Sequence, residues 1–495
     1  MTNTSPTDNT TAFDTLGLHP DILAGVIEAG FRAASPIQAQ AIPIVMAGHD
    51  LIGQAHTGTG KTAAFGLPAM SRIAHHKGVG LLVITPTREL ATQVSDELHR
   101  LGRHARIQTA TVYGGQPYRR QIEHIERGAQ VVVATPGRLL DLLKSKSLRH
   151  FSPSIVVLDE ADEMLDMGFL DDIKEIFTHL PEPRQTLLFS ATMPKPIRQL
   201  AQNILHDPVT VTVATSEATS KDISQHYYVI EESERDDATV RLIDSLEAEK
   251  SIIFCRTKSE VDRVNALLQA QGYTSLALHG DMDQRQREKA IAAFRRSAEI
   301  LVATDVAARG LDVSDVTHVF NYHIAFNPES YVHRIGRTGR AGRKGMAVTL
   351  VTPMELREIQ RIQQRTGKDI VQSFVPTRAE MQASMADRLA EAIRHQPLNE
   401  NAAPMLHALA DEMDPAHLAH KLLSMLLEKQ PIAGPETIGL RGERLKRTME
   451  RLHTRPGKGG RGAPHRYGGR RHPGQKHGRN KDFGRPAGKG RKKPY

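Results

Sequence analysis

The sequence predicts an α/β protein with two parallel-sheet domains in tandem, followed by a helical extension and a disordered basic tail. Short apolar runs rich in Val, Ile and Leu recur between residues 50 and 351 with helical patterns between them, as in parallel sheets with crossover helices. The 495 residues also exceed one ordinary domain. A polar stretch of small residues, ATSEATSKD at 214–222, separates two sets of runs and predicts a linker.

The two sets of apolar runs predict twelve strands. The first set lies at 50–53, 81–85, 109–113, 131–134, 155–158 and 186–189, and the second at 226–230, 251–255, 275–278, 300–303, 317–320 and 347–351. We therefore expect a disordered N-terminus at 1–11, a first domain at 12–213, the linker, a second domain at 223–375, a helical extension at 376–440 and the tail at 441–495. Polar clusters follow most strands, and ligands of parallel sheets gather at such carboxyl ends.

The positive charge is concentrated at the C-terminal end. The whole chain has a net charge of +9, but residues 441–495 hold 19 Lys and Arg against 3 Asp and Glu, which leaves −7 for the rest. Because this Gly-rich and Pro-rich segment has few apolar residues, we expect it to be disordered and to bind a polyanion such as RNA through counterion release and stacking. The alternative is a solubilising or localising tail.

Composition also bounds the class of protein. The chain has 39% hydrophobic and 24% charged residues, which is typical of a globular protein and excludes a fibre. Its single cysteine, Cys255, excludes an internal disulfide and a cysteine-built zinc site. With no long apolar run and no secretion signal at the start, we expect a cytoplasmic protein without a membrane partner.

The first polar cluster has the character of a phosphate-binding loop. Residues 55–62 read AHTGTGKT, in which Gly58 and Gly60 permit a turn with backbone N–H groups aimed at a phosphate. Lys61 supplies a positive charge, and Thr62 supplies the hydroxyl that such loops give to Mg²⁺. The usual first glycine of the motif is Ala55 here, so a plain Gly-rich turn remains the alternative.

A pair of carboxylates strengthens this interpretation. Asp159 and Glu160 directly follow the buried VVL strand, where an Mg²⁺-binding carboxylate is expected. One carboxylate can hold the metal while the next activates the attacking water. In the second domain, YVHRIGRTGRAGR at 331–343 repeats arginine every three residues among glycines, which favours a phosphate clamp over a surface helix. The alternative is a basic turn that faces RNA only.

Together these motifs resemble the DEAD-box ATP-dependent RNA helicases. Residues 159–162 read DEAD, and the likeness covers about 13–375. The motifs occur in the family's order: GFRAASPIQ, AHTGTGKT, PTRELA, the glycine pair at 114–115, TPGR, DEAD, SAT, IIFCRTK, HGDMDQRQR, ATDVAARGLD and HRIGRTGR. The resemblance implies two RecA-like domains with ATP and Mg²⁺ as cofactors. His56 replaces the family's usual Gln, with little consequence expected.

The resemblance also implies roles for individual residues. Gln38 would read the adenine edge, Phe13 would stack on it, and Asp312 would touch the ribose. Lys61 and Thr62 would bind phosphate and Mg²⁺, Asp159 would hold the Mg²⁺, Glu160 would position the water, and Arg337 and Arg340 would reach the γ-phosphate as arginine fingers. Asp162, Ser190, Thr192 and His333 would couple the two domains. The RNA face would comprise Thr87, Arg88, Gly115, Thr135, Arg138, Arg256, Gly280, Arg287 and Thr304, mostly through backbone and 2′-OH contacts.

The residues after 376 predict helices with an apolar side. Thr377 and Glu380 form the pattern of a capping box before Met381, Met385, Leu389 and Ile393, and Asp414–Pro415 begins a further helix with Leu418, Leu422, Met425 and Leu426. These residues would pack on the second domain or pair with a second copy of the chain. The layout resembles bacterial cold-shock and ribosome-assembly members of the family.

The resulting hypothesis is an RNA helicase that locally unwinds short duplexes when ATP closes the two domains on single-stranded RNA. Ribosome assembly, RNA decay or cold adaptation, within ribosomal-precursor or decay assemblies, would be its setting. An ATP-gated RNA clamp or annealing chaperone is the alternative, and a DNA helicase of a related superfamily is disfavoured by the Gln38 motif and by DEAD itself.

Overall fold

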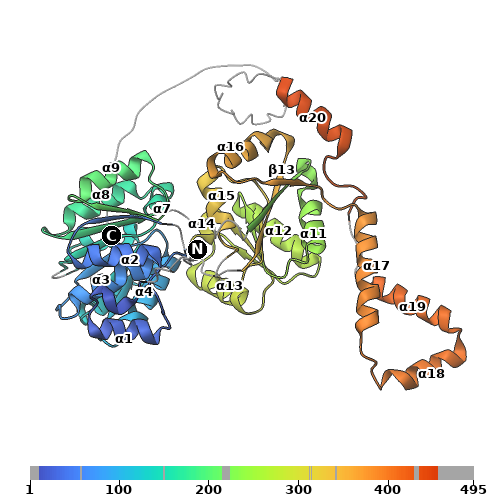
Figure 1. Cartoon of the computed structure of the whole chain (residues 1–495), viewed down its shortest axis with the longest axis horizontal. Coiled ribbons are helices and arrows are strands. Elements are labelled where there is room, and N and C mark those ends of the chain that lie inside the picture. Colours follow the sequence, from blue (N-terminus) through green and yellow to red (C-terminus); the bar gives the residue numbers. More distant parts are fainter. Residues whose placement is uncertain are drawn as a thin grey trace, which may run out of the picture.

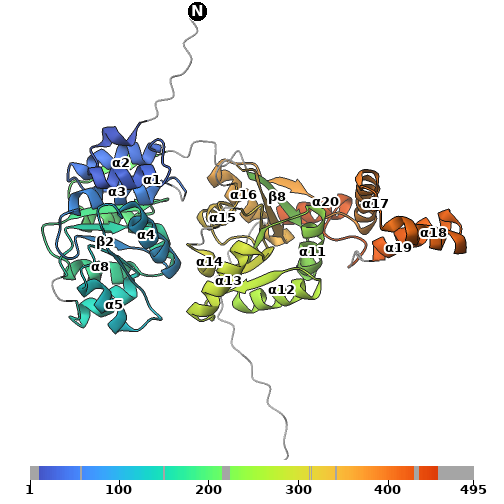
Figure 2. The ribbon, with the colours of Figure 1, turned by 90° about the horizontal axis from the view of Figure 1, so that it is seen from below.

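The computed structural model describes residues 11–55, 58–148, 151–213, 223–310, 313, 315–339, 343–428 and 434–454. These residues form two parallel-sheet domains with an arm of helices beyond the second (Figures 1 and 2). None of the described helices combines the length and apolar character needed to cross a membrane. The predicted linker at 214–222 lies outside the described residues, as do residues 1–10 of the predicted N-terminus.

The first domain is a seven-stranded parallel sheet in the order β3-β4-β2-β5-β6-β1-β7. Its strands are β1 (Leu51–Gln54), β2 (Leu81–Ile84), β3 (Thr109–Val112), β4 (Val131–Ala134), β5 (Ile155–Leu158), β6 (Gln185–Ser190) and β7 (Val209–Thr212). Its helices are the 3-10 helix η1 (Phe13–Leu16), α1 (Pro20–Glu28), α2 (Pro36–Met46), α3 (Lys61–Ile73), α4 (Arg88–Leu101), α5 (Tyr118–Glu126), α6 (Pro136–Lys144), α7 (Ala161–Asp166), α8 (Leu170–His179) and α9 (Lys195–Ile204).

The second domain repeats this plan in the order β10-β11-β9-β12-β13-β8-β14, again with parallel pairs throughout. Its strands are β8 (Ile223–Val229), β9 (Ser251–Cys255), β10 (Ser275–Leu278), β11 (Ile300–Thr304), β12 (His318–Asn321), β13 (Gly345–Val351) and β14 (Val371–Ser373). Its helices are η2 (Glu232–Glu234), α11 (Arg235–Ser245), α12 (Lys258–Ala270), α13 (Gln284–Arg296), α14 (Asp305–Ala308), α15 (Pro328–Ile335), η3 (Pro353–Glu355) and α16 (Leu356–Thr366).

Both faces of each sheet are buried. Along β2, Leu81 and Val83 join one apolar cluster, while Leu82 and Ile84 join the cluster on the other face. This pattern explains why the strands read as continuous apolar runs rather than as alternating ones. All twelve predicted strands are confirmed. Two short edge strands, β7 and β14, were not predicted, because most of their side chains are exposed and polar residues interrupt them.

The arm contains the predicted helical extension. It comprises α17 (Arg378–His395), α18 (Ala402–Glu412) and α19 (Pro415–Glu428). The capping box of Thr377 and Glu380 is confirmed, and Asp414 Oδ2 accepts a hydrogen bond from the Ala416 N–H at the start of α19. Of the apolar residues predicted on α17, Met381 is buried, whereas Ile393 is 51% exposed. The arm therefore docks on the second domain only near its base.

After the arm the chain returns to the second domain, so that both ends of the arm are attached at one place. We call this place the closed root. Ile438 and Leu440 are buried in the apolar clusters of that domain, and the Leu440 N–H donates to the Val229 carbonyl over 2.8 Å. At the same place Arg241 Nη2 donates to the Pro435 carbonyl over 2.7 Å, and the Arg378 N–H that opens α17 donates to the Glu436 carbonyl. Both ends of the arm are thus fastened at one place.

The predicted start of the disordered tail is wrong for its first residues. After Arg441 the chain forms helix α20 (Gly442–Thr454), which packs near η3. Leu445 packs against the apolar cluster of the second domain, and Arg447 pairs with Glu443 one turn away. Local amphipathic spacing is sufficient for this helix, although the segment as a whole is basic. The rest of the predicted tail, 455–495, lies outside the described residues.

Candidate active site

Sheet topology sorts the predicted site residues into two groups. In the first domain, the residues assigned to phosphate and Mg²⁺ follow β1 and β5, and the coupling residues Ser190 and Thr192 stand at the end of β6, which lies between these two strands. The residues assigned to RNA follow β2, β3 and β4, which form the other half of the sheet. In the second domain, the residues assigned to RNA follow β9, β10 and β11. Apart from Phe13 and Gln38, which precede β1 on η1 and α2, these residues lie at carboxyl ends of parallel strands, where ligands of such sheets bind.

The loop before α3 has the geometry of an anion site. Gly58 and Gly60 adopt φ values of +84° and +88°, which glycine reaches without steric cost. Lys61 begins α3, and its Nζ lies 4.0 Å from Asp159 Oδ1. That Nζ is buried and has no hydrogen-bond partner among the described residues. A buried ammonium group without a hydrogen bond is costly unless an anion completes the site, so a phosphate group fits here. Thr62 follows on α3; His56 lies outside the described residues.

Gln38 braces this loop from α2. Its Oε1 accepts a hydrogen bond from the Ser35 N–H over 2.8 Å, and its Nε2 donates to the Gly60 carbonyl over 3.1 Å. A side chain at Gly60 would collide with this amide, because an added Cβ would lie 2.3 Å from Nε2. Phe13 is buried and meets Phe31 edge-on at 6.0 Å. The adenine roles of Gln38 and Phe13 stay predictions.

Asp159 and Glu160 are both buried at the end of β5. Burial raises the pKa of Asp159, although the charge of Lys61 opposes this. Burial likewise raises the pKa of Glu160 to about 7, against the lowering effect of Lys61, and the neighbouring charges of Asp159 and Glu163 add to the rise. Glu160 also has left-handed backbone angles of φ 54° and ψ 53°. Such strain, worth about 1–3 kcal/mol, is concentrated at functional sites.

Asp162 links α7 to the end of β6. Its Oδ2 accepts hydrogen bonds from the Thr192 N–H over 2.8 Å and from Thr192 Oγ1 over 3.0 Å, while its own N–H donates to Ser190 Oγ. Ser190 Oγ in turn donates to the Thr192 carbonyl over 2.7 Å. Three of the four residues predicted to couple the domains therefore form one hydrogen-bonded unit within the first domain.

The fourth residue, His333, meets a partner that the sequence analysis missed. His333 Nδ1 pairs with Glu163 Oε1, and Arg309 Nε pairs with the other oxygen of the same carboxylate. Arg309 also reaches Asp166 Oδ2 over 3.0 Å. Glu163 lies on α7 of the first domain, whereas both cations belong to the second domain. We call this group, Glu163 with Arg309 and His333, the interdomain bridge.

Charge explains why the interdomain bridge is stable in a buried place. Glu163 is only 5% exposed, and a carboxylate at such a site requires cationic partners. Burial alone would lower the pKa of His333, but the hydrogen bond and charge of Glu163, together with Asp162 and Glu160, raise it above its ordinary value. The sequence signal was the acidic residue directly after DEAD, but no spacing rule connects it to residues about 150 positions away.

The arginines of the second domain divide into two kinds. Arg337 Nε donates to the His333 carbonyl over 3.3 Å, and its charge lowers the pKa of Glu160. Arg337 and Glu160 line one hollow, together with Lys61 and Glu163. Arg334 is instead buried and pairs with Asp305 over 2.7 Å, so the predicted phosphate clamp is wrong for that arginine. Arg340 and Asp312 lie outside the described residues.

The predicted RNA residues of the first domain lie at three neighbouring strand ends. Thr87 caps α4 by accepting from the Leu90 N–H, and Arg88 lies against the glycine pair that includes Gly115. Thr135 precedes α6. Arg138 Nη1 donates to the Gln116 carbonyl over 2.8 Å, which holds its guanidinium 3.9 Å from the centre of the Tyr118 ring.

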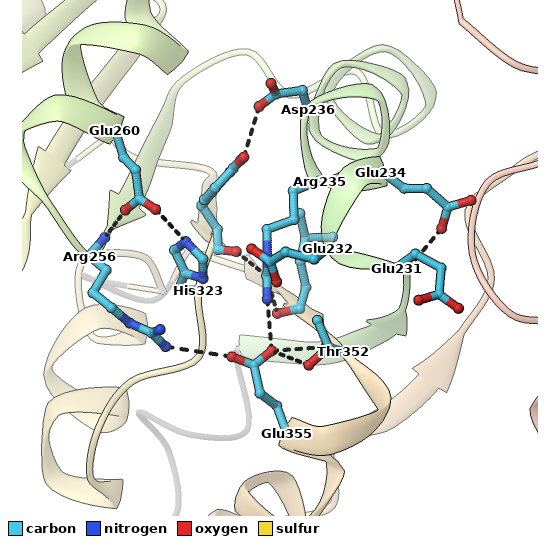
Figure 3. A network of polar contacts seen from close by, with 12 residues as sticks. Glu231, Glu232, Glu234, Arg235, Asp236, Arg256, Glu260, His323, Thr352 and Glu355 are labelled. Atoms are coloured by element: carbon cyan, nitrogen blue, oxygen red, sulfur yellow. Dashed lines mark hydrogen bonds and ion pairs between the residues drawn. The ribbon is translucent and has the colours of Figure 1, made fainter. Parts of the chain in front are cut away.

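The predicted RNA residues of the second domain include one that sits in a polar network (Figure 3). Arg256 Nη2 lies 3.5 Å from Glu355, whose carboxylate also binds the buried Arg235 over 2.8 Å. The Arg256 N–H donates to Glu260, which also contacts His323. The network fixes Arg256 at the carboxyl end of β9. Gly280 follows β10, and Thr304 ends β11.

Contacts also join the two domains on the RNA side. Arg287 pairs with Glu89 over 3.0 Å, and Arg88 Nη1 donates to Gln284 Oε1 over 3.3 Å. Gln93 Nε2 donates to the Gly310 carbonyl over 2.6 Å. Two arginines predicted to contact RNA therefore also connect the domains in this structure.

Comparisons with known proteins agree with this geometry. The chain matches the family model DEAD/DEAH box helicase over residues 35–200 and the model Helicase conserved C-terminal domain over residues 234–342. It is 47% identical over 422 residues to the DEAD-box ATP-dependent RNA helicase RhpA of Helicobacter pylori, covering 85% of each chain. It is 44% identical over 405 residues to the DEAD-box ATP-dependent RNA helicase CshA of Bacillus cereus, covering 81% of this chain and 77% of that one.

Solved structures of DEAD-box helicases are also similar to this chain. Saccharomyces cerevisiae Dbp5 bound to RNA and ADP BeF3 is 33% identical with a TM-score of 0.67, over 73% of this chain and 95% of that chain. The DEAD-box helicase Mss116 bound to single-stranded RNA and AMP-PNP is 27% identical with a TM-score of 0.68, over 77% of this chain and 83% of that chain.

Proposed function

The chain belongs to the DEAD-box family of ATP-dependent RNA helicases, and we propose that it separates short RNA duplexes by closing its two domains on single-stranded RNA when ATP binds. The observation that carries this proposal is the position of Glu160. Its buried carboxylate lies in one hollow with Lys61 of its own domain and Arg337 of the other. A site made from both domains is complete only when they meet.

The residues present fit ATP with Mg²⁺. Lys61 and the backbone around Gly58 and Gly60 would hold the phosphates, and Thr62 with Asp159 would hold the metal. Mg²⁺ is usually held by one or two carboxylates together with substrate phosphates, which is the kind of site that these residues would offer. When bound, the metal supplies charge neutralisation at the phosphates.

Glu160 is proposed to orient and deprotonate the attacking water. A general base acts best when its pKa lies near the working pH, and the pKa of Glu160 is raised to about 7. Arg337 would stabilise the negative charge that develops on the γ-phosphate, and Arg340 is proposed to do the same. Asp162, Ser190 and Thr192 would keep α7 and the end of β6 in fixed register beside this reaction.

RNA would lie across the other halves of both sheets. Closure would bend the bound strand, and a bent strand cannot stay in an A-form duplex, so its partner would dissociate locally. Because ATP and RNA would both favour the closed state, each must raise the affinity for the other by the same factor.

An ATP-gated RNA clamp or annealing chaperone is the second candidate. The excess of Lys and Arg in residues 455–495 favours it, because a basic segment can hold two strands together. Steady-state ATPase with RNA, with DNA and without polymer, run beside unwinding and annealing of one short duplex, separates the candidates. Stimulation by RNA with unwinding supports the helicase. Annealing without unwinding supports the second candidate, and equal stimulation by DNA contradicts both.

A homodimer through the arm is a further proposal. Leu422, Met425 and Leu426 on α19 are 42–58% exposed, and Met405 and Leu406 on α18 are 67% and 52% exposed. Such a group of apolar side chains on a two-helix arm suits self-association. Sedimentation of the full chain beside Leu422→Glu/Leu426→Glu tests it; a monomeric wild type would contradict it.

A cytoplasmic role in ribosome assembly, RNA decay or cold adaptation is a separate proposal. Growth of a deletion strain in the cold tests it.

A further inference from the structure

In the part of the chain that the structure describes, few large aromatic rings are exposed, and each has an arginine against it. Among the described residues, the aromatic side chains that are both large and exposed are Tyr118 at 46%, Phe326 at 68% and Phe374 at 49%. The guanidinium carbons of Arg138, Arg256 and Arg441 lie 3.9, 5.1 and 5.7 Å from the centres of these rings, in the same order. An isolated exposed apolar residue is ordinary, but a repeated aromatic–arginine pair requires an explanation.

Two of the three pairs coincide with the predicted RNA surface, one on each domain. Arg138 follows β4 and Tyr118 follows β3, which is the neighbouring strand. Arg256 follows β9 and Phe326 follows β12, which are again neighbours. In both domains, therefore, the pair joins two adjacent carboxyl ends of the sheet.

Both pairs are held in place by other groups. Arg138 donates to the Gln116 carbonyl, and Tyr118 Oη donates to Asp141 Oδ2 over 3.1 Å. Arg256 is fixed by Glu355, which is itself anchored by Arg235 (Figure 3). The arginines and rings thus need little further ordering to bind a flat ligand.

The chemistry of such a pair suits an unpaired nucleobase. A base can stack on an aromatic ring or on the planar guanidinium, while the edge of the guanidinium remains near the phosphate backbone. Every base has a π-face, so this contact is tolerant of sequence, as expected of a helicase. Backbone contacts alone hold the strand but do not hold its bases apart.

We propose that the Tyr118–Arg138 and Phe326–Arg256 pairs are stacking platforms for unpaired RNA bases, one on each domain. This inference rests on the proposed function, because it assigns base contacts to the same bound single strand. Closure would then fix two bases of one strand on two separate bodies, which opposes their return to a duplex.

The first test measures RNA affinity of the full-length protein with a non-hydrolysable ATP analogue. The probe is a 12-nucleotide single-stranded RNA. Phe326→Ala and Tyr118→Ala should each weaken binding by at least about fivefold, the lower end of what one stacked base contributes. Phe326→Tyr and Tyr118→Phe keep the rings and should lose much less affinity than the alanine variants, although Tyr118→Phe also removes the hydrogen bond to Asp141. Phe374→Ala is the matched control, because Phe374 follows β14, the edge strand on the opposite side of the sheet from β9, β10 and β11, and it should have no effect.

The second test asks whether a base is the ligand. The same RNA is prepared with a single abasic site or a single 2-aminopurine at each position in turn. One abasic position should weaken wild-type binding yet cause no further loss in Phe326→Ala, and another position should behave likewise with Tyr118→Ala. The fluorescence of 2-aminopurine at those positions should change on binding to the wild type and not to the matching variant.

Several outcomes would overturn the inference. They are unchanged affinity in both alanine variants, an equal loss in Phe374→Ala, or the same loss on fully abasic RNA. If instead wild-type protein neither binds RNA nor hydrolyses ATP faster with it, the proposed function itself fails. Both experiments change exposed side chains, and circular dichroism verifies that the variants are folded.

Discussion

The two sheet domains share one architecture but differ in the charged groups that they bring to the boundary between them. The first domain contributes the carboxylates Asp159, Glu160 and Glu163, and the second contributes Arg309, His333 and Arg337. Each set would be unfavourable in a buried place without the other. The repeated fold therefore does not determine the function by itself. The function depends on the different charged groups at the two sheet edges that face each other.

The largest effect is expected when the carboxylate of Glu160 is removed from the first domain. Glu160→Gln keeps the shape of the side chain and the contacts of Lys61 and Asp159, but it cannot take a proton from water. We expect turnover to fall about a hundredfold or more, with ATP and RNA affinities nearly unchanged. Single-turnover hydrolysis and equilibrium binding measure the two quantities.

Lys61→Ala provides the contrast for that experiment. It removes the buried cation of the anion site, so nucleotide affinity itself should fall. Near-normal turnover in Glu160→Gln would contradict the role of Glu160, and unaltered ATP affinity in Lys61→Ala would contradict the phosphate-binding role of the loop.

Removing the basic segment 455–495 measures how strongly the two sheet domains bind RNA without it. Residues 455–495 hold 14 Lys and Arg against one Asp. Truncation after Thr454 keeps α20 and the closed root intact, and we expect RNA affinity to fall about 10- to 100-fold at low salt with a shallower dependence on salt. ATPase at saturating RNA should persist. Binding across a salt series is the measurement, and identical slopes would show that the segment does not contact RNA.

The interdomain bridge can be broken from either domain. Glu163→Gln leaves Arg309 and His333 without their shared carboxylate, so the closed state becomes less favourable. We expect the factor by which ATP raises RNA affinity to fall about tenfold, since a partly buried charged contact contributes on the order of 1–3 kcal/mol. Binding of RNA with and without an ATP analogue gives this factor.

A double-mutant cycle identifies the bridge as the cause. Arg309→Gln should produce a similar loss, and the double variant should lose little more than either single one. Asp166→Asn removes the more exposed partner of Arg309 and should have a smaller effect. Additive losses would mean that Glu163 and Arg309 act independently.

The smallest effect on turnover is a dependence on pH, in which activity and stability move in opposite directions. The folded-state pKa of Glu160 is about 7, above its ordinary 4.5. As pH rises from 4.5 to 7 the folded protein must lose a proton that the unfolded chain has already lost, so the free protein becomes less stable, by up to about 3 kcal/mol. Turnover, which needs the carboxylate, should rise by up to about tenfold between pH 6 and 8.

Glu160→Gln again supplies the control for this prediction. Its glutamine does not titrate, so the difference in unfolding free energy between the variant and the wild type should grow from pH 5 to pH 8 in favour of the variant. Urea unfolding at the two pH values measures it, and a constant difference would contradict the raised pKa.

The sequence predicted the features that local pattern determines. Buried parallel strands are continuous apolar runs, so all twelve predicted strands are present. Asp159 and Glu160 were found because a strand ends directly before them. The period-three arginines, in contrast, could not reveal that Arg334 is buried against Asp305 while Arg337 faces the site, since that depends on how α15 packs.

The features that the sequence could not predict depend on contacts between distant segments, or on a short stretch whose residue pattern differs from the average composition of its surroundings. Glu163 gains its meaning only from Arg309 and His333 in the other domain. The edge strands β7 and β14 are stabilised by one neighbour each and lack an apolar signature. Helix α20 was hidden because the charge of the whole tail masked the local spacing around Leu445.

The closed root makes the arm an exchangeable module. Because the chain leaves the second domain at Arg378 and is fastened again by Glu436, Ile438 and Leu440, the ends of the arm lie together, as they do where a domain has been inserted into a host. Selection or an engineer could shorten, replace or remove α18 and α19 without altering either sheet or displacing α20. The helical arm can thus be changed while the two sheet domains are left as they are.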